Sequence, residues 1–312
     1  MDQVTVLIPV WKPGEQFGTL LKRLSLQTVR PKRVLIMNTV EGDEDDQLSA
    51  LVDTFQDRFE VLSVFHVEKK NFDHGGTRNL GFQFSDTQLV LCMTQDAIPA
   101  GSRLIEHLVR CFDDPKVAAA YGRQLAGKDC SAREAFTRRF NYPDQSMVKS
   151  GDDLETMGIK TFFCSDVCAM WRRDVYFELG GFEHPVIFNE DMILAGKLIE
   201  SGWKIAYAAD AAVWHSHNYS PARQMRRNFD LGVSQAQHPE LFASYPSEGE
   251  GIRLVKQCAA YLVKSGKPGE LFALAADSAS KYLGYRLGKN YRRLPKRWIK
   301  RLTDNQSYWE KC

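Results

Sequence analysis

The sequence predicts an α/β fold, in which a doubly wound parallel sheet is flanked by helices and followed by a helical C-terminal region. Short apolar runs rich in β-branched residues alternate with segments whose apolar residues recur at helical spacing. The units of strand plus helix repeat about every 25 to 30 residues, which is typical of parallel sheets with helical crossovers. The run 89–93 is wholly apolar, as expected for a strand buried on both faces of such a sheet.

The first part of the chain shows this alternation most clearly. Residues 4–10 (VTVLIPV) form the first apolar run, and the later runs are bounded by polar or turn residues. We expect strands at 4–10, 33–37, 61–67, 89–93 and 117–121. The segments between them place apolar residues three and four positions apart, which predicts helices. These helices are expected at 15–26, 46–55, 76–84 and 102–112, the last with Ser102 as its N-cap.

The pattern dissolves into polar and charged residues over 126–160, where we expect a long mobile segment with a short helix at 133–140. Loops of this length in a compact domain are usually functional. Beyond it, Asp174 is the expected cap of a short helix that ends at 180–181. The remaining elements are expected as a strand around Phe162, a helix at 189–201, strands at 203–208 and 211–214, and a helix from Ser220 to Leu231.

Length and composition place the chain among ordinary globular proteins. A chain of 312 residues is long enough for one large or two modest domains. We expect a main domain at 1–240, with halves at 1–125 and 126–240, and a basic helical extension at 241–312. Seven cysteines without regular spacing argue against a disulfide framework and, with no signal-peptide pattern, indicate a reducing cytoplasm. No apolar run approaches the roughly 20 residues that span a bilayer.

Basic residues gather near the C-terminal end. Between 281 and 301 there are nine Lys or Arg and no acid, interleaved with Tyr, Leu and Trp. A basic helix that carries aromatic residues suits an anionic membrane surface. The alternative is a helical pair that packs on the rest of the chain or on a second subunit, which would make a homodimer. Nucleic acid is a poorer partner, because no binding motif accompanies the charge.

The buried run 89–93 ends abruptly in Thr94, Gln95 and Asp96. Ligands of open α/β sheets bind beyond the carboxyl ends of the strands, so Asp96 could hold a divalent cation against a phosphorylated substrate. Mg²⁺ or Mn²⁺ fits an all-oxygen site of this kind. The alternative is that Asp96 only caps a turn. The Gly-x-Gly-x-x-Gly turn and the Walker loop are both absent, which argues against a dinucleotide or P-loop enzyme.

Two further segments carry cations that could bind a ligand, and each also has a purely structural interpretation. The segment 74–79 (HGGTRN) joins glycines, which allow close backbone approach, to Arg78, whose guanidinium suits a phosphate or a ribose. Its alternative is a Gly-Gly turn with a helix cap. Arg223 lies three and four positions before Arg226 and Arg227, so these cations can share a helix face and clamp a pyrophosphate. Their alternative is a solvated charged face.

Histidines and paired carboxylates mark the remaining candidates. His215 and His217 follow a predicted strand, where a period of two places both rings on one face. Ordinary structural histidines are the alternative. Glu190 and Asp191 open a predicted helix, and adjacent carboxylates there usually stabilise the helix dipole. The N-terminal amides of that helix should lower the pKa of Asp191 and keep it ionised.

Taken together in their order and spacing, these segments resemble the family 2 glycosyltransferases of the GT-A fold. Within that family they are most similar to bacterial rhamnosyltransferases of cell-wall and surface polysaccharides, and the likeness spans nearly the whole chain. The matching segments are VTVLIPVW at 4–11, HGGTRNLG at 74–81, TQDAIP at 94–99, CSDVCAMWRRDVYFELGGF at 164–182, NEDMILAGKLIESGWKIAY at 189–207, HSHNY at 215–219 and YRLGKNYRRLP at 285–295.

The resemblance implies a GT-A fold with a mixed, mostly parallel sheet, and an inverting transfer of L-rhamnose from dTDP-β-L-rhamnose to a lipid-linked polysaccharide. Asp191 would be the base that deprotonates the acceptor hydroxyl. Asp96 would contact Mg²⁺ or Mn²⁺, although Thr94 replaces the first Asp of the usual Asp-x-Asp motif. His215 or His217 would contact the metal or the diphosphate. The alternatives are a UDP-hexose donor, or a catalytically silent scaffold that binds sugar nucleotides.

The resemblance also assigns the residues around the two substrates. Those implied for the nucleotide sugar are Pro9, Val10, Trp11, Asn38, His74, Arg78, Asn79, Gln95 and Asp96. Asn38 stands where many members carry an Asp, and its amide suits a pyrimidine imide without separating thymine from uracil. Asp166 and Glu190 would bind or orient the acceptor, with a plain turn as the alternative for Asp166. Such a protein would work in the bacterial cytoplasm at the inner face of the cell membrane.

Overall fold

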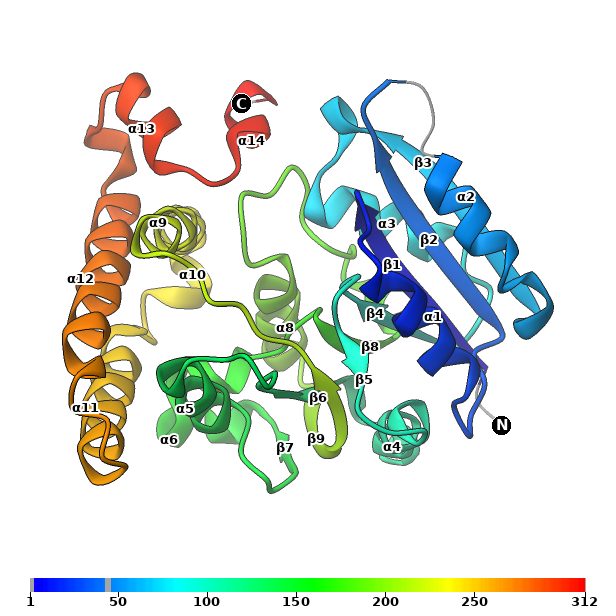
Figure 1. The fold of residues 1–312 in the computed structure, drawn as a ribbon, viewed down its shortest axis with the longest axis horizontal. Coiled ribbons are helices and arrows are strands. Elements are labelled where there is room, and N and C mark those ends of the chain that lie inside the picture. Colours follow the sequence, from blue (N-terminus) through cyan, green and yellow to red (C-terminus); the bar gives the residue numbers. More distant parts are fainter. Residues whose placement is uncertain (1–2, 43–45, 312) are drawn as a thin grey trace. The chain divides into compact units, whose positions relative to one another are not determined.

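The computed structural model describes residues 3–42 and 46–311, and the chain divides into two compact units (Figure 1). The first unit comprises the chain up to Leu125 together with residues 142–184 and 190–215. The second unit comprises residues 126–141, residues 185–189 and the chain from Ser216 onward. Because each unit is assembled from three segments, the chain passes between them repeatedly.

The first unit is built on one mixed sheet. Its strands are β1 (Val4–Trp11), β2 (Arg33–Val40), β3 (Val61–Glu68), β4 (Leu89–Met93), β5 (Ile98–Pro99), β6 (Val117–Leu125), β7 (Met147–Lys149), β8 (Cys168–Arg172) and β9 (Lys204–Trp214). They lie in the order β3-β2-β1-β4-β8-β6-β9-β5, with β7 paired to β9. The first four strands are parallel, as the sequence predicts, whereas β8 runs antiparallel between β4 and β6.

Helices cover both faces of this sheet (Figure 1). They are α1 (Gln16–Ser25), α2 (Asp46–Asp53), α3 (His74–Gln83), α4 (Leu104–Arg110), α6 (Leu154–Met157), α7 (Arg173–Glu178) and α8 (Glu190–Glu200). Short 3-10 turns are η1 (Gln56–Arg58), η2 (Lys69–Asn71), η3 (Cys111–Asp113), η4 (Gly151–Asp153) and η5 (Gly158–Phe162). Buried side chains of α1, α2 and α4 pack with Val6 and Ile8 of β1. Leu7 points the other way, where α3 approaches so closely that a Cβ on Gly81 would lie 2.2 Å from it.

Four local predictions are wrong in their details. Ser102 is not an N-cap, because α4 begins at Leu104 without a side-chain cap. Asp174 lies inside the first turn of α7, where its carboxylate accepts from the Val175 amide instead of capping the helix. The residues around Phe162 form η5 and not a strand. The two strands expected at 203–208 and 211–214 are one strand, β9, which accommodates a register irregularity against β6.

The segment 126–160 contains more regular structure than the sequence suggests, and the short helix expected within it is confirmed as α5 (Ala132–Asn141). The rest forms β7, η4, α6 and η5. The buried Lys149 organises this region, since its ammonium donates to the Lys160 and Phe163 carbonyls and to the Tyr121 hydroxyl. Burial lowers the pKa of Lys149 to about 7. The segment therefore has internal partners that composition alone does not reveal.

The second unit is helical. Besides α5 it contains α9 (Pro221–Gln237), α10 (Pro239–Phe242), α11 (Glu248–Lys264), α12 (Glu270–Lys289), η6 (Tyr291–Arg293), α13 (Lys296–Leu302) and α14 (Gln306–Lys311). The helix predicted from Ser220 is α9, and Ser220 caps it by accepting from the Arg223 amide. Helices α9 and α12 touch backbone to backbone, because a Cβ on Gly284 or Gly288 would lie 2.1 Å from a carbonyl oxygen of α9. None of the helices in the described ranges is long and apolar enough to cross a bilayer.

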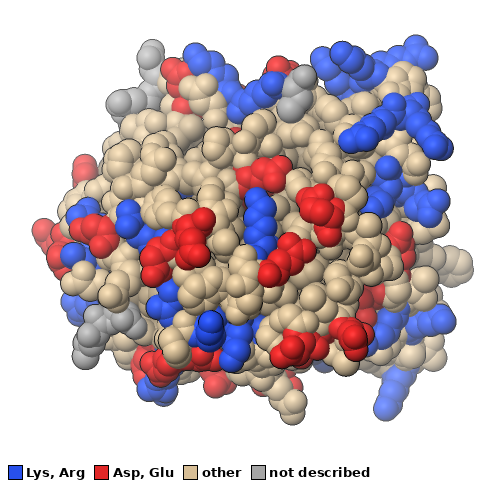
Figure 2. Space-filling view, turned by 180° about the vertical axis from the view of Figure 1, so that it is seen from behind, with Lys and Arg blue, Asp and Glu red and all other residues tan. Residues whose placement is uncertain are grey.

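The C-terminal end of the second unit carries an exposed group of cations. Figure 2 shows Lys and Arg side chains gathered at its upper right, over the region of α13. The segment is held to α9 through Asp230, a buried residue whose carboxylate accepts from the Thr303 hydroxyl and the Asp304 and Asn305 amides. The exposed cations of η6 and α13 are Arg292, Arg293, Lys296, Arg297, Lys300 and Arg301.

Candidate functional site

Two acidic residues emerge at the same edge of the sheet in the first unit. Asp96 follows β4 by three residues, and Asp166 precedes β8 by two. The last residue of β4, Met93, is paired with the first residue of β8, Cys168. Because antiparallel neighbours bring the end of one strand to the start of the other, Asp96 and Asp166 leave the sheet at a common place.

Arg78 of α3 lies between two carboxylates beside this edge. Its Nε is 3.2 Å from the Asp166 carboxylate, and its Nη1 is 3.0 Å from the Glu190 carboxylate at the start of α8. All three side chains are at most about a tenth exposed. The indole of Trp171 also donates to Asp166, at 3.0 Å. The sequence predicts a phosphate or ribose for this guanidinium, whereas here it pairs with the protein's own carboxylates.

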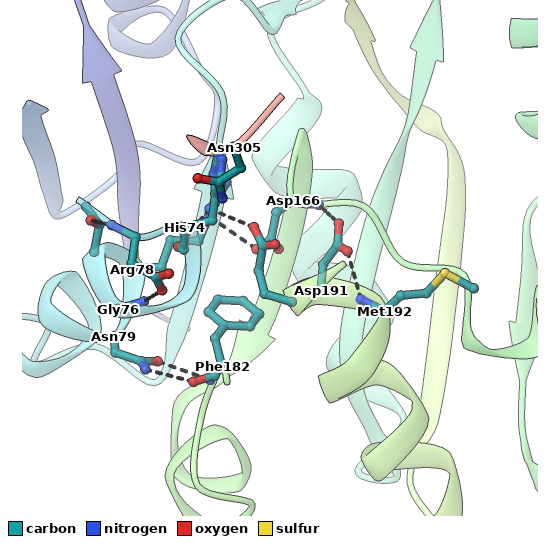
Figure 3. A network of polar contacts seen from close by, with 12 residues as sticks. His74, Gly76, Arg78, Asn79, Asp166, Phe182, Asp191, Met192 and Asn305 are labelled. Carbon is teal, nitrogen blue, oxygen red and sulfur yellow. Dashed lines mark hydrogen bonds and ion pairs between the residues drawn. The ribbon is translucent and has the colours of Figure 1, made fainter. Parts of the chain in front are cut away.

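Asp191 is tied to the same group of residues (Figure 3). One of its carboxylate oxygens accepts from the Asp166 amide at 3.1 Å, and the other accepts from the Met192 amide at 2.7 Å. These amides favour the ionised form, but burial and the neighbouring Glu190 outweigh them and raise the pKa of Asp191 to about 7. The expectation that the helix N-terminus lowers this pKa is therefore wrong. A carboxylate that titrates near neutral pH suits a general base.

The cluster holds more negative than positive charge. Burial, reinforced by Asp191 and Glu190, raises the pKa of Asp166 well above its usual value, while Arg78 opposes that rise. The same carboxylates raise the pKa of Arg78 despite its burial, so the guanidinium stays charged. Three carboxylates thus share one cation, and we expect the group to retain a proton near neutral pH.

A chain of polar contacts leads from Asp96 back toward this cluster. The Asp96 carboxylate is 3.5 Å from Nε2 of His215, just past the end of β9. Nδ1 of His215 lies 3.0 Å from the side-chain oxygen of Gln124, and the Gln124 amide nitrogen donates to the Ser165 hydroxyl at 3.1 Å. Ser165 immediately precedes Asp166, whose amide bonds Asp191. The candidate metal ligand and the candidate base are therefore connected within one unit.

The geometry of Asp96 and His215 fits a divalent cation. The side-chain oxygen of Gln124 only accepts, so Nδ1 of His215 carries the hydrogen of this bond, and in the neutral form of the ring Nε2 presents a lone pair toward Asp96. A lone pair and a carboxylate attract each other only through a shared proton or a cation. A ligating histidine is commonly oriented in this way by a hydrogen bond from its other nitrogen.

The carboxyl ends of β1 and β3 form a second, more exposed part of the site. Trp11 is 48% exposed, and the ammonium groups of Lys12 and Lys69 lie 5.4 and 5.1 Å from the centre of its ring. The Gln95 side chain binds both the amide and the carbonyl of Trp11, at 2.8 and 3.2 Å. Both lysines pair with Glu41. This arrangement presents an aromatic face with two cations next to residues 9–11.

Asn38 is a buried polar residue near the end of β2. It is 1% exposed, and its side-chain oxygen has no hydrogen-bond partner within the described residues. Its side-chain nitrogen lies 3.4 Å from Nδ1 of His66, its register partner on β3. An unsatisfied buried acceptor costs on the order of 1 to 3 kcal/mol, which a donor on a ligand would offset.

The segment 74–79 opens α3, with Asp73 as an N-cap that accepts from the Gly76 amide. A Cβ on Gly75 would lie 2.0 Å from the Glu183 carbonyl oxygen, so this glycine permits close approach of the protein's own chain. The Asn79 amide bonds the carbonyl and the amide of Phe182 (Figure 3). The His74 ring packs edge-on against Phe72 at 5.1 Å. In this structure the segment fastens the loop at 182–184.

The remaining predicted residues belong to the second unit. The His217 ring stacks on Tyr219 with centroids 4.9 Å apart. The guanidinium groups of Arg223 and Arg227 also lie over Tyr219. Arg223 and Arg226 approach the Asp304 carboxylate at 3.9 and 3.6 Å. The three arginines therefore share one side of α9.

Sequence reasoning missed Lys12, Lys69, His66, Gln124 and Trp171. Lys12 and Lys69 follow β1 and β3 directly, so the rule that ligands lie beyond strand ends could have found them. His66 could have been found in the same way, near the end of β3. Gln124 and Trp171 lie inside strands and gave no signal of this kind.

The family model described as glycosyltransferase like family 2 matches residues 2–230. The O-antigen chain rhamnosyltransferase RfbN of Salmonella typhimurium is 38% identical over 309 residues, covering 98% of this chain and 96% of the relative. The O-antigen chain rhamnosyltransferase WbaN of Salmonella anatum is 34% identical over 312 residues, covering 99% and 96%.

Solved structures share the fold. The mannosyltransferase PcManGT of Pyrobaculum calidifontis, in complex with GDP-Man and Mn²⁺, gives a TM-score of 0.60 at 15% identity and covers 99% of this chain and 86% of its own. S. aureus TarS in complex with UDP-GlcNAc gives a TM-score of 0.55 at 13% identity, with coverages of 93% and 92%. The expected GT-A architecture is confirmed.

Proposed function

Because this chain belongs to the family 2 glycosyltransferases, we propose that it transfers L-rhamnose from dTDP-β-L-rhamnose to a lipid-linked polysaccharide acceptor, with inversion to an α-linkage. That it is a glycosyltransferase follows from the family itself. The names of the two Salmonella relatives, which match the chain over almost its full length, support rhamnose as the sugar and a surface polysaccharide as the product.

The observation that carries the mechanism is the connection between Asp96 and Asp191 through His215, Gln124 and Ser165. In the proposed step the acceptor oxygen forms a bond to the anomeric carbon, its proton passes to Asp191, and the bond to the diphosphate breaks with its electron pair. Attack and departure on opposite faces invert the configuration. The acceptor hydroxyl would lie near Asp191, and Glu190 and Asp166 would orient it.

Asp96 and His215 would hold Mg²⁺ or Mn²⁺. When bound, such an ion neutralises the charge that develops on the departing diphosphate. Gln124 fixes the ring of His215 in the orientation this role requires. EDTA should stop transfer, Mn²⁺ should restore it, and His215→Ala should raise the Mn²⁺ concentration needed for half-maximal rate. Full activity in EDTA would refute the metal assignment.

The nucleotide would lie against the carboxyl ends of β1 to β4. Pro9, Val10 and Trp11 would flank the base, Lys12 and Lys69 would attract the anionic part of the donor, and the Asn38 oxygen would accept from the base imide. Gln95 holds the backbone of Trp11 in place. Thymine and uracil present the same imide, so a UDP-hexose stays the alternative donor. A thermal-shift screen of the two kinds of donor distinguishes them, because a ligand at 100 times its dissociation constant stabilises the folded protein by about 2.7 kcal/mol.

The decisive experiment is Asp191→Asn in a transfer assay. We expect loss of transfer with donor affinity retained, because the amide cannot accept the proton. Asp210→Asn, an exposed acid on β9, is the matched control and should transfer normally. The wild-type rate should also rise with pH around 7, as Asp191 ionises. Normal transfer by the Asp191 variant would refute the assignment of the base.

We also propose that the cations of η6 and α13 bring the protein to the anionic inner face of the bacterial cell membrane. Six exposed Lys or Arg residues lie within residues 292–301, beside the half-exposed Trp298. Each cation near such a surface contributes about 1 kcal/mol. Flotation with vesicles should show binding that needs anionic lipid and weakens in high salt. Equal flotation with neutral vesicles would contradict the proposal.

A further inference from the structure

Helix α12 of the second unit, which Figure 1 shows in orange, has one face whose residues are exposed and uncharged over most of its length. Its opposite face is buried against α9 through Gly284, Tyr285 and Gly288. Surface helices normally turn charged or polar residues toward water. The exposed residues of α12 before Arg286 are Phe272, Ala275, Ala276, Ala279, Tyr282 and Leu283.

The spacing of these residues forms a continuous stripe. Counted from Phe272, the other five lie three, four, seven, ten and eleven positions further on, which is the pattern of a helix that packs along another helix. The largest of them are well exposed, with Phe272 at 86%, Tyr282 at 56% and Leu283 at 54%. Apolar stripes of this kind on a protein surface mark interaction sites.

We infer that this stripe is a self-association surface, on which α12 of a second copy of the chain lies antiparallel about a two-fold axis at Ala279. In this register Ala276 of one copy faces Tyr282 of the other, and Ala275 of one copy faces Leu283 of the other, because these residues lie three and four positions on either side of Ala279. Each large side chain then meets a small one. A parallel register would instead place alanines opposite alanines.

Charge favours the same arrangement. The first turn of α12 contains Glu270, which also contacts Arg133 of its own chain, and its last turn contains Arg286 and Lys289. Antiparallel pairing places the acidic start beside the basic end of the partner, and Phe272 opposite Arg286, where a guanidinium can stack on the ring. A lipid surface is less suited, because three of the six exposed residues are alanines that add little apolar depth.

Sedimentation velocity of the full-length protein tests the surface. One helix from each copy makes a small interface, so we expect a dissociation constant on the order of 10 µM. Ala279→Glu would place two carboxylates together at the axis and should abolish the dimer. Ala260→Glu, on an exposed position of α11, is the matched control and should dimerise normally.

A cross-link tests the register. Ala279→Cys should give a disulfide-linked dimer under mild oxidation, and Ala260→Cys should give no more than the wild type. A wild type that stays monomeric at about 100 µM, ten times the expected constant, would overturn the proposal. So would a dimer that Ala279→Glu leaves intact, or loss of binding to anionic vesicles as the only effect of that variant.

Discussion

Replacing Arg78 by methionine tests whether this residue holds the acidic cluster together. The substitution keeps the volume of the side chain but removes the cation between Asp166 and Glu190, whose contacts with it are 3.2 and 3.0 Å. Removing one partner of a buried ion pair costs roughly 3 to 5 kcal/mol, since it leaves a carboxylate buried without compensation. That is a large part of the roughly 5 to 15 kcal/mol that stabilises a typical domain.

The matched control is Arg33→Met. Arg33 makes a two-pronged pair with Asp86 at 2.8 and 2.9 Å, but the two side chains are 29% and 49% exposed. Exposed pairs contribute about 1 kcal/mol or less. In urea denaturation followed by tryptophan fluorescence, we expect Arg78→Met to lose several times more stability than Arg33→Met. Equal losses below about 1 kcal/mol would refute the buried clamp.

Arg78→Lys separates the effect on chemistry from the effect on folding. It keeps a charge near Asp166 and Glu190 but cannot bridge both with the fixed fork of a guanidinium. Removing the charge, as in Arg78→Met, should raise the pKa of Asp191 further above 7, because Arg78 lowers it in the wild type. The midpoint of the pH–rate profile should therefore move up in Arg78→Met and less in Arg78→Lys. Weaker donor binding with an unmoved midpoint would instead assign Arg78 to the nucleotide.

Three other perturbations follow from single contacts. Gly75→Ala should lower the free energy of unfolding by about 1 to 3 kcal/mol, because the new Cβ would lie 2.0 Å from a carbonyl oxygen. The control is Gly14→Ala, whose Cβ would meet nothing within 4 Å, so it should cost far less. Equal losses of stability in urea denaturation would contradict this expectation. Gln124→Met should weaken Mn²⁺ activation without changing stability by more than about 1 to 3 kcal/mol, and unchanged Mn²⁺ dependence would contradict its role. Burial raises the pKa of Asp230 to about 7, so the folded state binds this proton more tightly than the unfolded chain. The free energy of unfolding of the wild type should then fall as the pH rises from about 4 to about 7, by at most about 4 kcal/mol. Asp230→Asn should show a smaller fall over the same range. An equal dependence of stability on pH in the two proteins would refute this role of Asp230.

The alternation of strands and helices could be read from the sequence because it depends on local periodicity. β1 and β4 begin where expected, and the apolar run at 89–93 is a buried central strand. The antiparallel β8 was not predicted from periodicity, because its residues read equally well in either direction. The regular structure of the segment 126–160 was not predicted for a related reason. It depends on contacts between Lys149 and carbonyls more than ten residues away, and composition does not encode such contacts.

The site was predictable where chemistry follows a strand end, and not where it depends on pairing between strands. Asp96, Trp11 and Asn38 all sit at carboxyl ends of parallel strands, where a general rule places ligands. Gln124 reaches His215 only because β6 and β9 are paired in a particular register, with Leu125 opposite Trp214. A shift by one residue would turn the Gln124 side chain to the opposite face. No local pattern specifies that register.

The ionisation of Asp191 shows why the local rule failed at the residue that matters most. The helix amides act as predicted, since the Met192 amide and the Asp166 amide both bond the carboxylate and favour its charge. What the sequence could not supply is the environment: α8 begins against a buried guanidinium that Asp166 and Glu190 already share. Burial and a second acid then exceed the effect of two amides, and the pKa rises to about 7. A base with an unperturbed pKa would be ionised at every physiological pH but would accept a proton weakly, whereas one near 7 is both available and basic enough to take it.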